Sequence, residues 1–198
     1  MPHAVNEVGC PTIEPVAIVG MGKFPIMIPK SLENSSQLLA CRLPGGVDTA
    51  SSLWEMLINN RSAQTPKVPK SRFDIDAYYH ENLERPGSFN VRGGYFLEGP
   101  AENFDPSFFG ISPIETMWMD PQQRKILEVT YECFESAGLT LEDVSDSNTA
   151  VFIGSFTSDF QQMLFRESDF RHSYSATGVD PGIISNRVGN TFNLRGPR

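Results

Sequence analysis

The sequence has few basic residues for its length, and this shortage excludes one large class of protein. Its 198 residues include 16 Lys and Arg against 24 Asp and Glu, which gives a net charge of −8 at pH 7. Proteins that bind nucleic acids need clustered cations to displace the counterions of the phosphates, and here the basic residues are scattered along the chain. We therefore expect no nucleic-acid partner.

Cysteine and histidine are equally scarce, with three of each. They are Cys10, Cys41 and Cys133, and His3, His80 and His172. No two of these six residues are close enough in sequence to form the short-spaced ligand pairs of a zinc site, and an odd number of cysteines argues against a disulfide framework. We expect reduced structural thiols, no metal and no directly bound cofactor.

Long hydrophobic runs are absent as well. No apolar run approaches the roughly 20 residues of a membrane-spanning helix, and residues 1–9 lack the regions of a secretory signal. With 39% hydrophobic and 20% charged residues, the composition is typical of an ordinary soluble domain. We expect no membrane contact and a cytoplasmic location.

The stretch 103–138 carries the clearest signals of secondary structure. Ser112-Pro113 has the residue types of a helix N-cap and first turn, and Glu115 can complete a capping box. Asp120-Pro121 repeats the signal, and Gly138 is suited to a left-handed helix end. We predict a short helix followed by a long amphipathic one. The buried face of the long helix is predicted to contain Leu127, Thr130, Tyr131, Phe134 and Ala137.

Buried strands are predicted on either side of these helices. Residues 16–19 (VAIV) and 149–154 (TAVFIG) are short, continuous apolar runs that are followed by or end in glycine. Because strands and helices then alternate along the chain, we predict a layered α/β domain. Ligands in such domains bind beyond the strand ends, so the segment 155–160 is a candidate pocket wall.

Two further helices and one long connection complete the prediction. Asp48 or Ser52 is predicted to cap a helix, and Asp180-Pro181 to begin the last one. Their buried faces are predicted to be Leu53, Trp54, Leu57 and Ile58 in the first, and Ile183, Ile184, Val188, Thr191 and Phe192 in the last. The connection 59–103 is rich in Pro and Gly, and we expect its aromatic clusters at 73–79 and 95–96 to anchor it by packing.

Residues 19–22 (VGMG) begin like the glycine-rich turn that binds dinucleotides. The third glycine of that motif is replaced by Pro25, and Phe24-Pro25 cannot open a phosphate-binding helix as small residues do. We therefore predict no nicotinamide or flavin site.

Several longer motifs are similar to those of one enzyme family. They are EPVAIVGM (14–21), CRLPGG (41–46), GGYFLEGPAENFDPSFF (93–109), FFGISP (108–113), MDPQQR (119–124) and TGVDPGIISNRVGNTFNLRGP (177–197). In this order they resemble the β-ketoacyl synthase (ketosynthase) domain of type I iterative polyketide synthases. The amino-acid sequences of FTSDFQQM (156–163) and of residues 177–188 are most similar to those of the fungal highly reducing type.

The resemblance implies an α/β fold of the thiolase-like class, with layers in the order α-β-α-β-α. Residues 14–198 would be the N-terminal part of a ketosynthase domain, an incomplete N-terminal half of that fold, and residues 1–13 a disordered N-terminus. The other half of the fold would cover one face of this part. We therefore expect an exposed apolar surface on the order of several hundred Å², and low stability of this part in isolation.

The resemblance also implies the chemistry of the complete enzyme, which is a decarboxylative Claisen condensation of acyl and malonyl thioesters. In the family the nucleophilic cysteine follows the LRGP motif, so it is expected about eight residues beyond Pro197. The two catalytic histidine motifs lie further downstream, and neither Cys41 nor Cys133 matches the nucleophile. We expect no catalytic residue within this chain, which ends at Arg198, and no activity.

Further expectations follow from the family. The complete enzyme would use an acyl carrier domain with its phosphopantetheine group, and it would pair as a ketosynthase homodimer. Phe156, Thr157 and Phe160 would line the acyl pocket or lie beside the dimer contact, or form plain core. Two alternatives stay open: a non-catalytic interaction module that pairs with a full-length synthase, and a generic α/β binding domain, which only VAIVGMG supports.

Residues 22–39 depart from the family pattern, because the first strand usually runs almost directly into the CRLPGG turn. This insertion has no helical or strand period, and its apolar patch at 26–28 would be exposed on the surface. Two interpretations stay open, a genuine surface loop and a translated, retained intron. Gly22-Lys23-Phe24 can be encoded by GGTAAGTTT, which contains a common 5′ splice-site sequence, and sequencing of the spliced transcript distinguishes the two.

Overall fold

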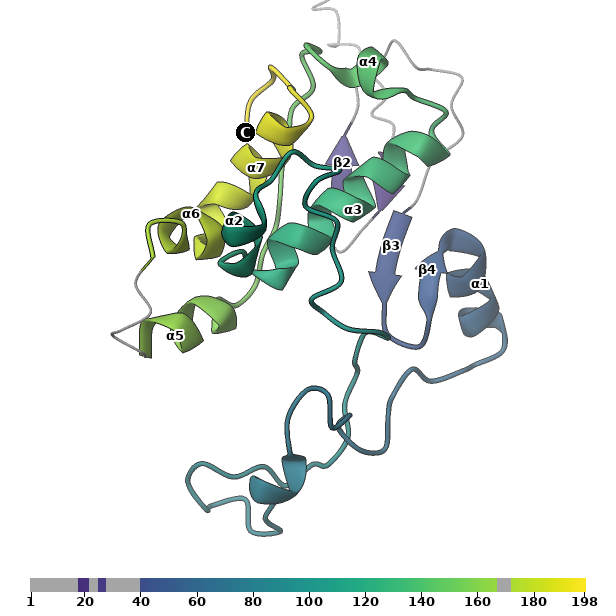
Figure 1. The fold of residues 1–198 in the computed structure, drawn as a ribbon. Helices are drawn as coiled ribbons and strands as arrows, with labels where there is room; N and C mark the ends of the chain where they lie inside the picture. The colour runs from purple at the N-terminus through teal and green to yellow at the C-terminus, as the bar shows by residue number, and fades with distance from the viewer. Residues whose placement is uncertain (1–17, 22–24, 28–39, 167–171) are drawn as a thin grey trace, which may run out of the picture.

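The computed structural model describes residues 18–21, 25–27, 40–166 and 172–198 (Figure 1). In chain order its elements are β1 (Ile18–Met21), β2 (Pro25–Met27), β3 (Ala40–Leu43), β4 (Val47–Thr49), α1 (Ala50–Ile58), the 3-10 turn η2 (Ile75–Ala77), α2 (Pro113–Met117), α3 (Pro121–Ser136), α4 (Leu141–Val144), α5 (Asp159–Arg166), α6 (Ser175–Val179), the 3-10 turn η4 (Pro181–Ile183) and α7 (Ile184–Thr191). The expected disorder of residues 1–13 and most of the 22–39 insertion lie outside the described residues.

Helices α2 and α3 begin where the sequence predicts. The Ser112 hydroxyl accepts a hydrogen bond from the Glu115 amide at 3.2 Å, and the Asp120 carboxylate accepts one from the Gln122 amide at 2.7 Å. Proline stands in the first turn of both helices, where its missing N–H costs no intrahelical bond. The predicted capping box at Ser112 is wrong, because the Glu115 carboxylate pairs with Arg187 of α7 instead of reaching back.

The end of α3 is also confirmed. Gly138 has a φ of +68° and donates its amide to the Glu135 carbonyl at 2.9 Å, and the Leu139 amide donates to the Phe134 carbonyl at 2.9 Å. These two bonds are the Schellman arrangement that satisfies the last carbonyls of a helix. Leu139 packs against the main core.

Helix α3 is buried on two faces. One face holds Leu127 and Phe134 in the main core, and these two side chains are almost fully buried. The other face places Val129 and Cys133 against Ala40 of β3 in a second, smaller cluster. The main core contains Ile111, Met119, Ile126, Leu127, Phe134, Val144, Val151, Ile184, Val188, Phe192 and Leu194. Of the predicted face, Leu127, Thr130 and Phe134 are buried, whereas Tyr131 and Ala137 are only half-buried.

The described strands form two antiparallel hairpins, β1 with β2 and β3 with β4. The described part of the first strand, 18–21, overlaps the predicted 16–19, of which residues 16 and 17 lie outside the described residues. This strand pairs with a strand inside the insertion, a segment predicted to have none. The second hairpin surrounds the predicted CRLPGG turn, where Gly45 and Gly46 have φ values of +82° and +71°. Glycine adopts such positive φ values without the penalty that a Cβ would impose.

The strand predicted at 149–154 does not form, which corrects that prediction. Thr149 and Val151 are buried, but no described strand lies beside them to complete a ladder. The Val151 amide instead donates to the Pro197 carbonyl at 2.8 Å. An apolar run predicts burial, whereas strand formation also needs a neighbour that supplies the second row of hydrogen bonds.

Helix α1 forms as predicted, but its apolar face is exposed, so its assignment to the core is wrong. Trp54, Leu57 and Ile58 are each more than half exposed, and no residue of α1 is buried. Its N-cap is Thr49, which shares a capping box with Ser52. The face has no described element to pack against.

The long connection forms a projection that we call the arm, residues 65–94, which extends away from the helices (Figure 1). It is closed at its base by hydrogen bonds between Thr65 and Gly94. The rings of Phe73, Tyr78 and Phe89 contact one another with centroids 6.2 to 6.4 Å apart. All three rings are exposed, and so is Tyr95, so the prediction that these aromatic clusters anchor the connection is not confirmed.

The last helix begins with the predicted cap and then changes pitch. The Asp180 carboxylate accepts a hydrogen bond from the Gly182 amide at 2.7 Å, and η4 leads directly into α7. Ile184, Val188 and Phe192 are buried, as predicted, whereas Ile183 and Thr191 are half-buried.

The Schellman arrangement predicts the effect of a single methyl group. Gly138→Ala should lower the free energy of unfolding by about 1 kcal/mol, because alanine strains the positive φ although nothing lies within 4 Å of its Cβ. The matched control is Gly154→Ala, where the surrounding space is equally open and φ is not positive. Equal denaturation midpoints for the two variants would contradict the left-handed assignment.

Candidate functional site

The three residues predicted to line a pocket lie on the segment that leaves residues 149–154 and enters α5. Phe156 is 91% exposed, Thr157 is exposed with a φ of +83°, and Phe160 is half-buried at the start of α5. A positive φ is rare for a β-branched residue, so this backbone is tightly constrained. The Ser155 hydroxyl donates to the Gln122 side chain at 3.3 Å, which ties the segment to the start of α3. The described residues form two cavities, one between the β3–β4 hairpin and the start of α3, and one between residues 103–109 and α3. None of the three predicted residues lines either cavity.

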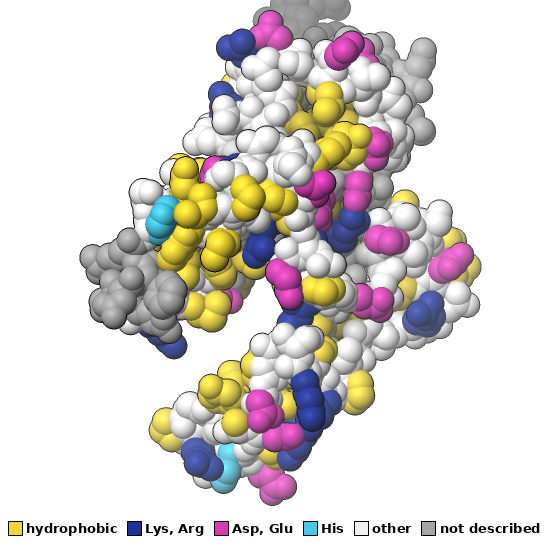
Figure 2. Space-filling model, viewed as in Figure 1, with side chains coloured by type: hydrophobic (Ala, Val, Ile, Leu, Met, Phe, Trp, Pro, Cys, Tyr) yellow, Lys and Arg dark blue, Asp and Glu magenta, His cyan; other side chains and the backbone are white. Residues whose placement is uncertain are grey.

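An exposed apolar surface surrounds this segment, as the sequence predicts. Helix α5 has no buried residue, and Met163 and Phe165 are more than half exposed. Met117 of α2 and Phe152 are exposed to a similar degree or more. Figure 2 shows hydrophobic side chains gathered over α2 and toward α5. Large exposed apolar patches are typical of surfaces that bind another protein segment.

A buried polar contact joins the two most specific motifs of the sequence. Gln123 of MDPQQR is fully buried, and its side-chain amide donates to the Thr177 carbonyl at 3.1 Å and to the Asp180 carbonyl at 3.5 Å. Its side-chain oxygen accepts a hydrogen bond from Arg187 at 3.3 Å. Thr177, Asp180 and Arg187 all belong to the TGVDPGIISNRV stretch. The first motif therefore fixes the path of the second.

Two further contacts hold the same junction. Arg187 forms an ion pair with Glu115 of α2, and both side chains are mostly buried. The Asp120 amide donates to the Gly178 carbonyl at 2.8 Å. A Cβ at Gly178 would lie 2.2 Å from the Trp118 carbonyl oxygen, so only glycine allows this approach. Sequence reasoning identified the motifs but missed these contacts; polar residues inside an otherwise apolar helix face were the available signal.

Aromatic rings close the edge of this junction. The His172 ring stacks on Trp118 at 5.3 Å with an interplanar angle of 9°, and on Tyr174 at 5.3 Å with an angle of 26°. The imidazole is therefore held between two rings. This position gives His172 a packing role.

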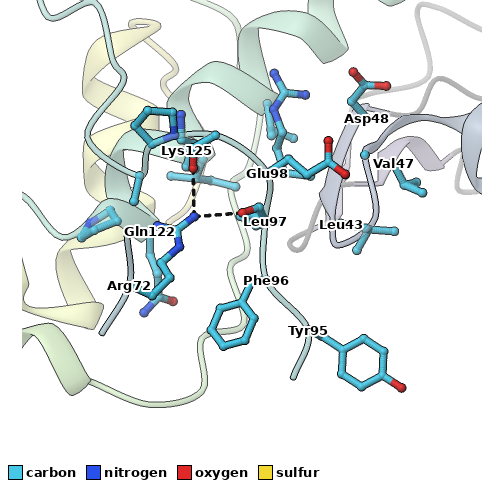
Figure 3. Close-up of a pocket in the computed structure, with 18 residues that line it drawn as sticks. Leu43, Val47, Asp48, Arg72, Tyr95, Phe96, Leu97, Glu98, Gln122 and Lys125 are labelled. Carbon is cyan, nitrogen blue, oxygen red and sulfur yellow. Dashed lines mark hydrogen bonds between the residues drawn. The ribbon is translucent and has the colours of Figure 1, made fainter. Parts of the chain in front are cut away.

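The larger cavity, about 520 Å³, lies between the β3–β4 hairpin, the segment 95–101 and the start of α3 (Figure 3). Its walls are largely apolar, and the cations on its rim already have partners. Arg72 donates to the Leu97 and Gly99 carbonyls at 2.9 and 3.0 Å, and Lys125 donates to the Asn103 carbonyl and to Glu128. Arg72 and Lys125 are therefore committed to partners within the protein, whereas the carboxylates of Asp48 and Glu98 also line the cavity.

The two described cysteines are unsuited to nucleophilic catalysis. Cys41 and Cys133 are both buried. Burial raises the pKa of the Cys133 thiol to about 11, and it also raises the pKa of Cys41, although the neighbouring Arg42 opposes that rise. Only the thiolate is an effective nucleophile, so both side chains are inert at neutral pH.

The described residues contain neither a metal-binding cluster nor a membrane-spanning helix. In residues 18–21, 25–27, 40–166 and 172–198, no three His, Cys, Asp or Glu side chains are arranged to hold a metal ion. No helix in that part of the chain has the length and hydrophobicity required to cross a bilayer.

Solved structures define the class of fold. A ketosynthase from module 6 of the bacillaene synthase of Bacillus subtilis 168 superposes with a TM-score of 0.65 and 31% identity, over 79% of this chain and 24% of that one. The oxazolomycin ketosynthase domain OzmH KS7 of Streptomyces albus JA3453 gives a TM-score of 0.66 and 26% identity, over 79% and 26% of the two chains. The chain thus has part of the thiolase-like α/β fold, which confirms the predicted fold class.

Sequence comparison is more specific. Residues 39–198 match the family model described as the N-terminal domain of β-ketoacyl synthases, and the chain belongs to this family. The chain is 57% identical over 185 residues to the reducing polyketide synthase DEP5 of Alternaria brassicicola, and 47% identical over 184 residues to the highly reducing polyketide synthase srdA of Neurospora crassa. Each match covers 93% of this chain and 7% of the relative. The predicted resemblance to fungal highly reducing synthases is confirmed.

The raised pKa of Cys133 predicts a loss of stability at high pH. The thiol ionises near 9 when unfolded and near 11 when folded, so the native state retains a proton that the unfolded state loses. The free energy of unfolding should be independent of this group below about pH 8, and fall by on the order of 2 kcal/mol as pH rises from 9 to 11. Denaturant titrations of the native chain and Cys133→Ala measure the difference. If the free energy of unfolding depended on pH in the same way in both proteins, the raised pKa of Cys133 would be contradicted.

Proposed function

We propose that this chain provides the N-terminal scaffold of a ketosynthase domain in a highly reducing, iterative polyketide synthase of the fungal type. The complete domain condenses an acyl thioester with a malonyl thioester, with loss of carbon dioxide. The observation that carries the proposal is the match of residues 39–198 to the β-ketoacyl synthase family, together with 57% identity to a reducing polyketide synthase. The chain spans 7% of the curated relatives, so the activity of the whole protein is part of the proposal.

The catalytic groups lie outside this chain in the proposal. Condensation needs a thiolate that accepts the acyl group and hydrogen-bond donors that stabilise the enolate of the malonyl unit. Cys41 and Cys133 are buried thiols with raised pKa values, which supports a purely structural role for both. The family resemblance places the nucleophile about eight residues beyond Pro197. By itself the chain is inactive.

The contribution of the chain is then to position the segment that leads to the nucleophile. Gln123 and Arg187 hold the stretch 177–188 against the start of α3, and α7 packs Ile184 and Val188 into the main core. Leu194 is buried in the same core. A catalytic residue that follows this stretch would inherit a fixed position, which catalysis by oriented groups requires.

The partners proposed for the complete enzyme are those of the family: an acyl carrier domain that presents phosphopantetheine-linked substrates, and a second ketosynthase. The exposed apolar side chains around α5 support contact with further protein. Phe156, Thr157 and Phe160 would lie at the acyl pocket or beside the dimer contact. The proposed location is the cytoplasm.

The family match begins at residue 39, where the 22–39 insertion ends. The match to the Alternaria relative covers 93% of the chain and therefore extends across the insertion, so a surface loop and a translated intron both stay open. The proposed scaffold role rests on the family motifs on both sides of the insertion and does not need the insertion itself.

The same exposed surface favours a second candidate function, a non-catalytic module that pairs with a full-length synthase. The two functions differ in what completion does to the chain. A scaffold becomes active when the missing part is supplied on the same polypeptide, whereas an interaction module co-purifies with an intact synthase and gains no activity of its own.

A chimera tests the scaffold function. The full chain, residues 1–198, is fused to the remainder of the ketosynthase domain from the Alternaria relative, and decarboxylation of a malonyl thioester is measured. The chain alone should show no turnover, and the chimera should be active. The control is the chimera with its nucleophilic cysteine changed to alanine. Turnover by the chain alone, or a folded chimera without activity, would refute the proposal.

The same chimera tests the pocket residues. Phe160→Ala should lower kcat/KM for acyl transfer by about tenfold, because a lost apolar contact to a bound chain is worth a factor of this order. Leu141→Ala is the control, since Leu141 is also partly exposed but lies on α4, at the other end of the molecule (Figure 1). Unchanged kinetics with Phe160→Ala would assign that side chain to packing alone.

A further inference from the structure

The arm, residues 65–94, carries an apolar surface that the proposed function does not use. Phe73, Tyr78 and Phe89 form one exposed aromatic cluster, and Leu83 and Val91 are more than half exposed nearby in the sequence. Figure 2 shows the arm standing apart from the helices, with open space between the two. Apolar rings in water on a projection of this kind are unfavourable unless something covers them.

The arm is a preformed structure. The Phe89 amide donates to the Tyr78 carbonyl and the His80 amide to the Phe89 carbonyl, both at 2.8 Å, so the two sides of the arm pair beside the aromatic cluster. Ile75 and Val68 are buried within it. The rings are therefore presented on a fixed backbone, which reduces the entropy lost when a partner binds them.

Three charged groups of the arm, those of Lys67, Asp76 and Arg92, are paired with one another. Asp76 binds Lys67 at 2.5 Å and Arg92 at 2.7 Å, and the Arg92 guanidinium lies 3.8 Å from the centre of the Tyr79 ring. The partner therefore need not supply charges to these groups. An apolar contact without charge pairing resembles the interior of a domain more than a transient interface.

The comparisons identify where such a partner surface comes from. The arm lies inside the matched region 39–198, so it belongs to the ketosynthase pattern. The solved ketosynthases extend well beyond it, because this chain corresponds to only 24 to 26% of their length. The rest of a ketosynthase domain is thus a large surface that is always present in the complete protein.

We propose that the arm is a clasp that packs Phe73, Tyr78 and Phe89 against the C-terminal remainder of the ketosynthase domain. The inference rests on the proposed function, since it takes the remainder of the domain as the partner. The contact buries the aromatic cluster, so the stability of the arm depends on the rest of the polypeptide.

The effect of one substitution in two backgrounds tests the clasp. Phe89→Ser is made in the chain alone and in the chimera with the Alternaria remainder, and the unfolding equilibrium is measured for both backgrounds with and without the substitution. The equilibrium between folded and unfolded protein should shift by less than about threefold in the chain and by at least about tenfold in the chimera, because only there is the ring buried. Leu141→Ser is the matched control, since Leu141 is 45% exposed against 54% for Phe89, and its effect should be equal in both proteins.

Limited proteolysis with chymotrypsin gives a second measurement that does not depend on reversible unfolding. Cleavage after Phe73, Tyr78 and Phe89 should be at least about tenfold slower in the chimera than in the chain. Equal effects of Phe89→Ser in the two proteins, or equal cleavage rates, would overturn the clasp. Protection that appears in the chain alone as its concentration rises would also overturn it, in favour of a second copy as the partner. Failure of the proposed function can be distinguished from failure of the clasp. The former leaves a folded chimera inactive, whereas the latter gives equal effects of Phe89→Ser, or equal cleavage rates, in the chain and the chimera.

Discussion

The burial of α3 on two opposite faces is the constraint on which the rest of the structure depends. Leu127 and Phe134 meet the main core on one side, while Val129 and Cys133 meet β3 on the other. A helix in this position joins elements that have little contact with one another. At its ends, Asp120 accepts a hydrogen bond from a first-turn amide and Gly138 donates one to a last-turn carbonyl, so both ends are capped within the chain.

The polar side chains at the start of α3 convert this packing into a defined geometry for the C-terminal stretch. Fully buried Gln123 uses both its donor and its acceptor, and Arg187 bridges it to Glu115. Buried polar groups are costly unless satisfied, so this arrangement fixes one relative position of the two motifs more strictly than apolar packing does. Such strictness is useful in a scaffold that must hold a reactive group which the scaffold does not itself contain.

The parts of the fold that depend on local chemistry could be predicted from the sequence. The caps at Ser112, Asp120 and Asp180 and the helix end at Gly138 each involve residues within a few positions of one another. The exposed face of α1 and the missing strand at 149–154 could not be predicted, because periodicity shows that a face is apolar and does not show what covers it. In the candidate site, the sequence located the motifs but could not pair Gln123 with Thr177, which lies 54 residues away.

The apolar surfaces left exposed on α1, on α5 and on the arm share one feature. Each lies on an element that the ketosynthase pattern includes, in a chain that corresponds to about a quarter of the solved ketosynthases. The described residues contain a well-packed centre around α3 and an outer shell, and we propose that further protein, in the same domain or in a partner, covers the apolar faces of this shell. Stability should therefore be concentrated at α3 and fall toward these outer elements.

Hydrogen exchange of the isolated chain measures this distribution most directly. The account predicts that the amides of α3 exchange most slowly, that those of α7 follow, and that those of α1, α5 and the arm exchange much faster. Amides of α1 or the arm that were as protected as those of α3 would show a self-contained globule with its apolar faces covered, and would contradict the account.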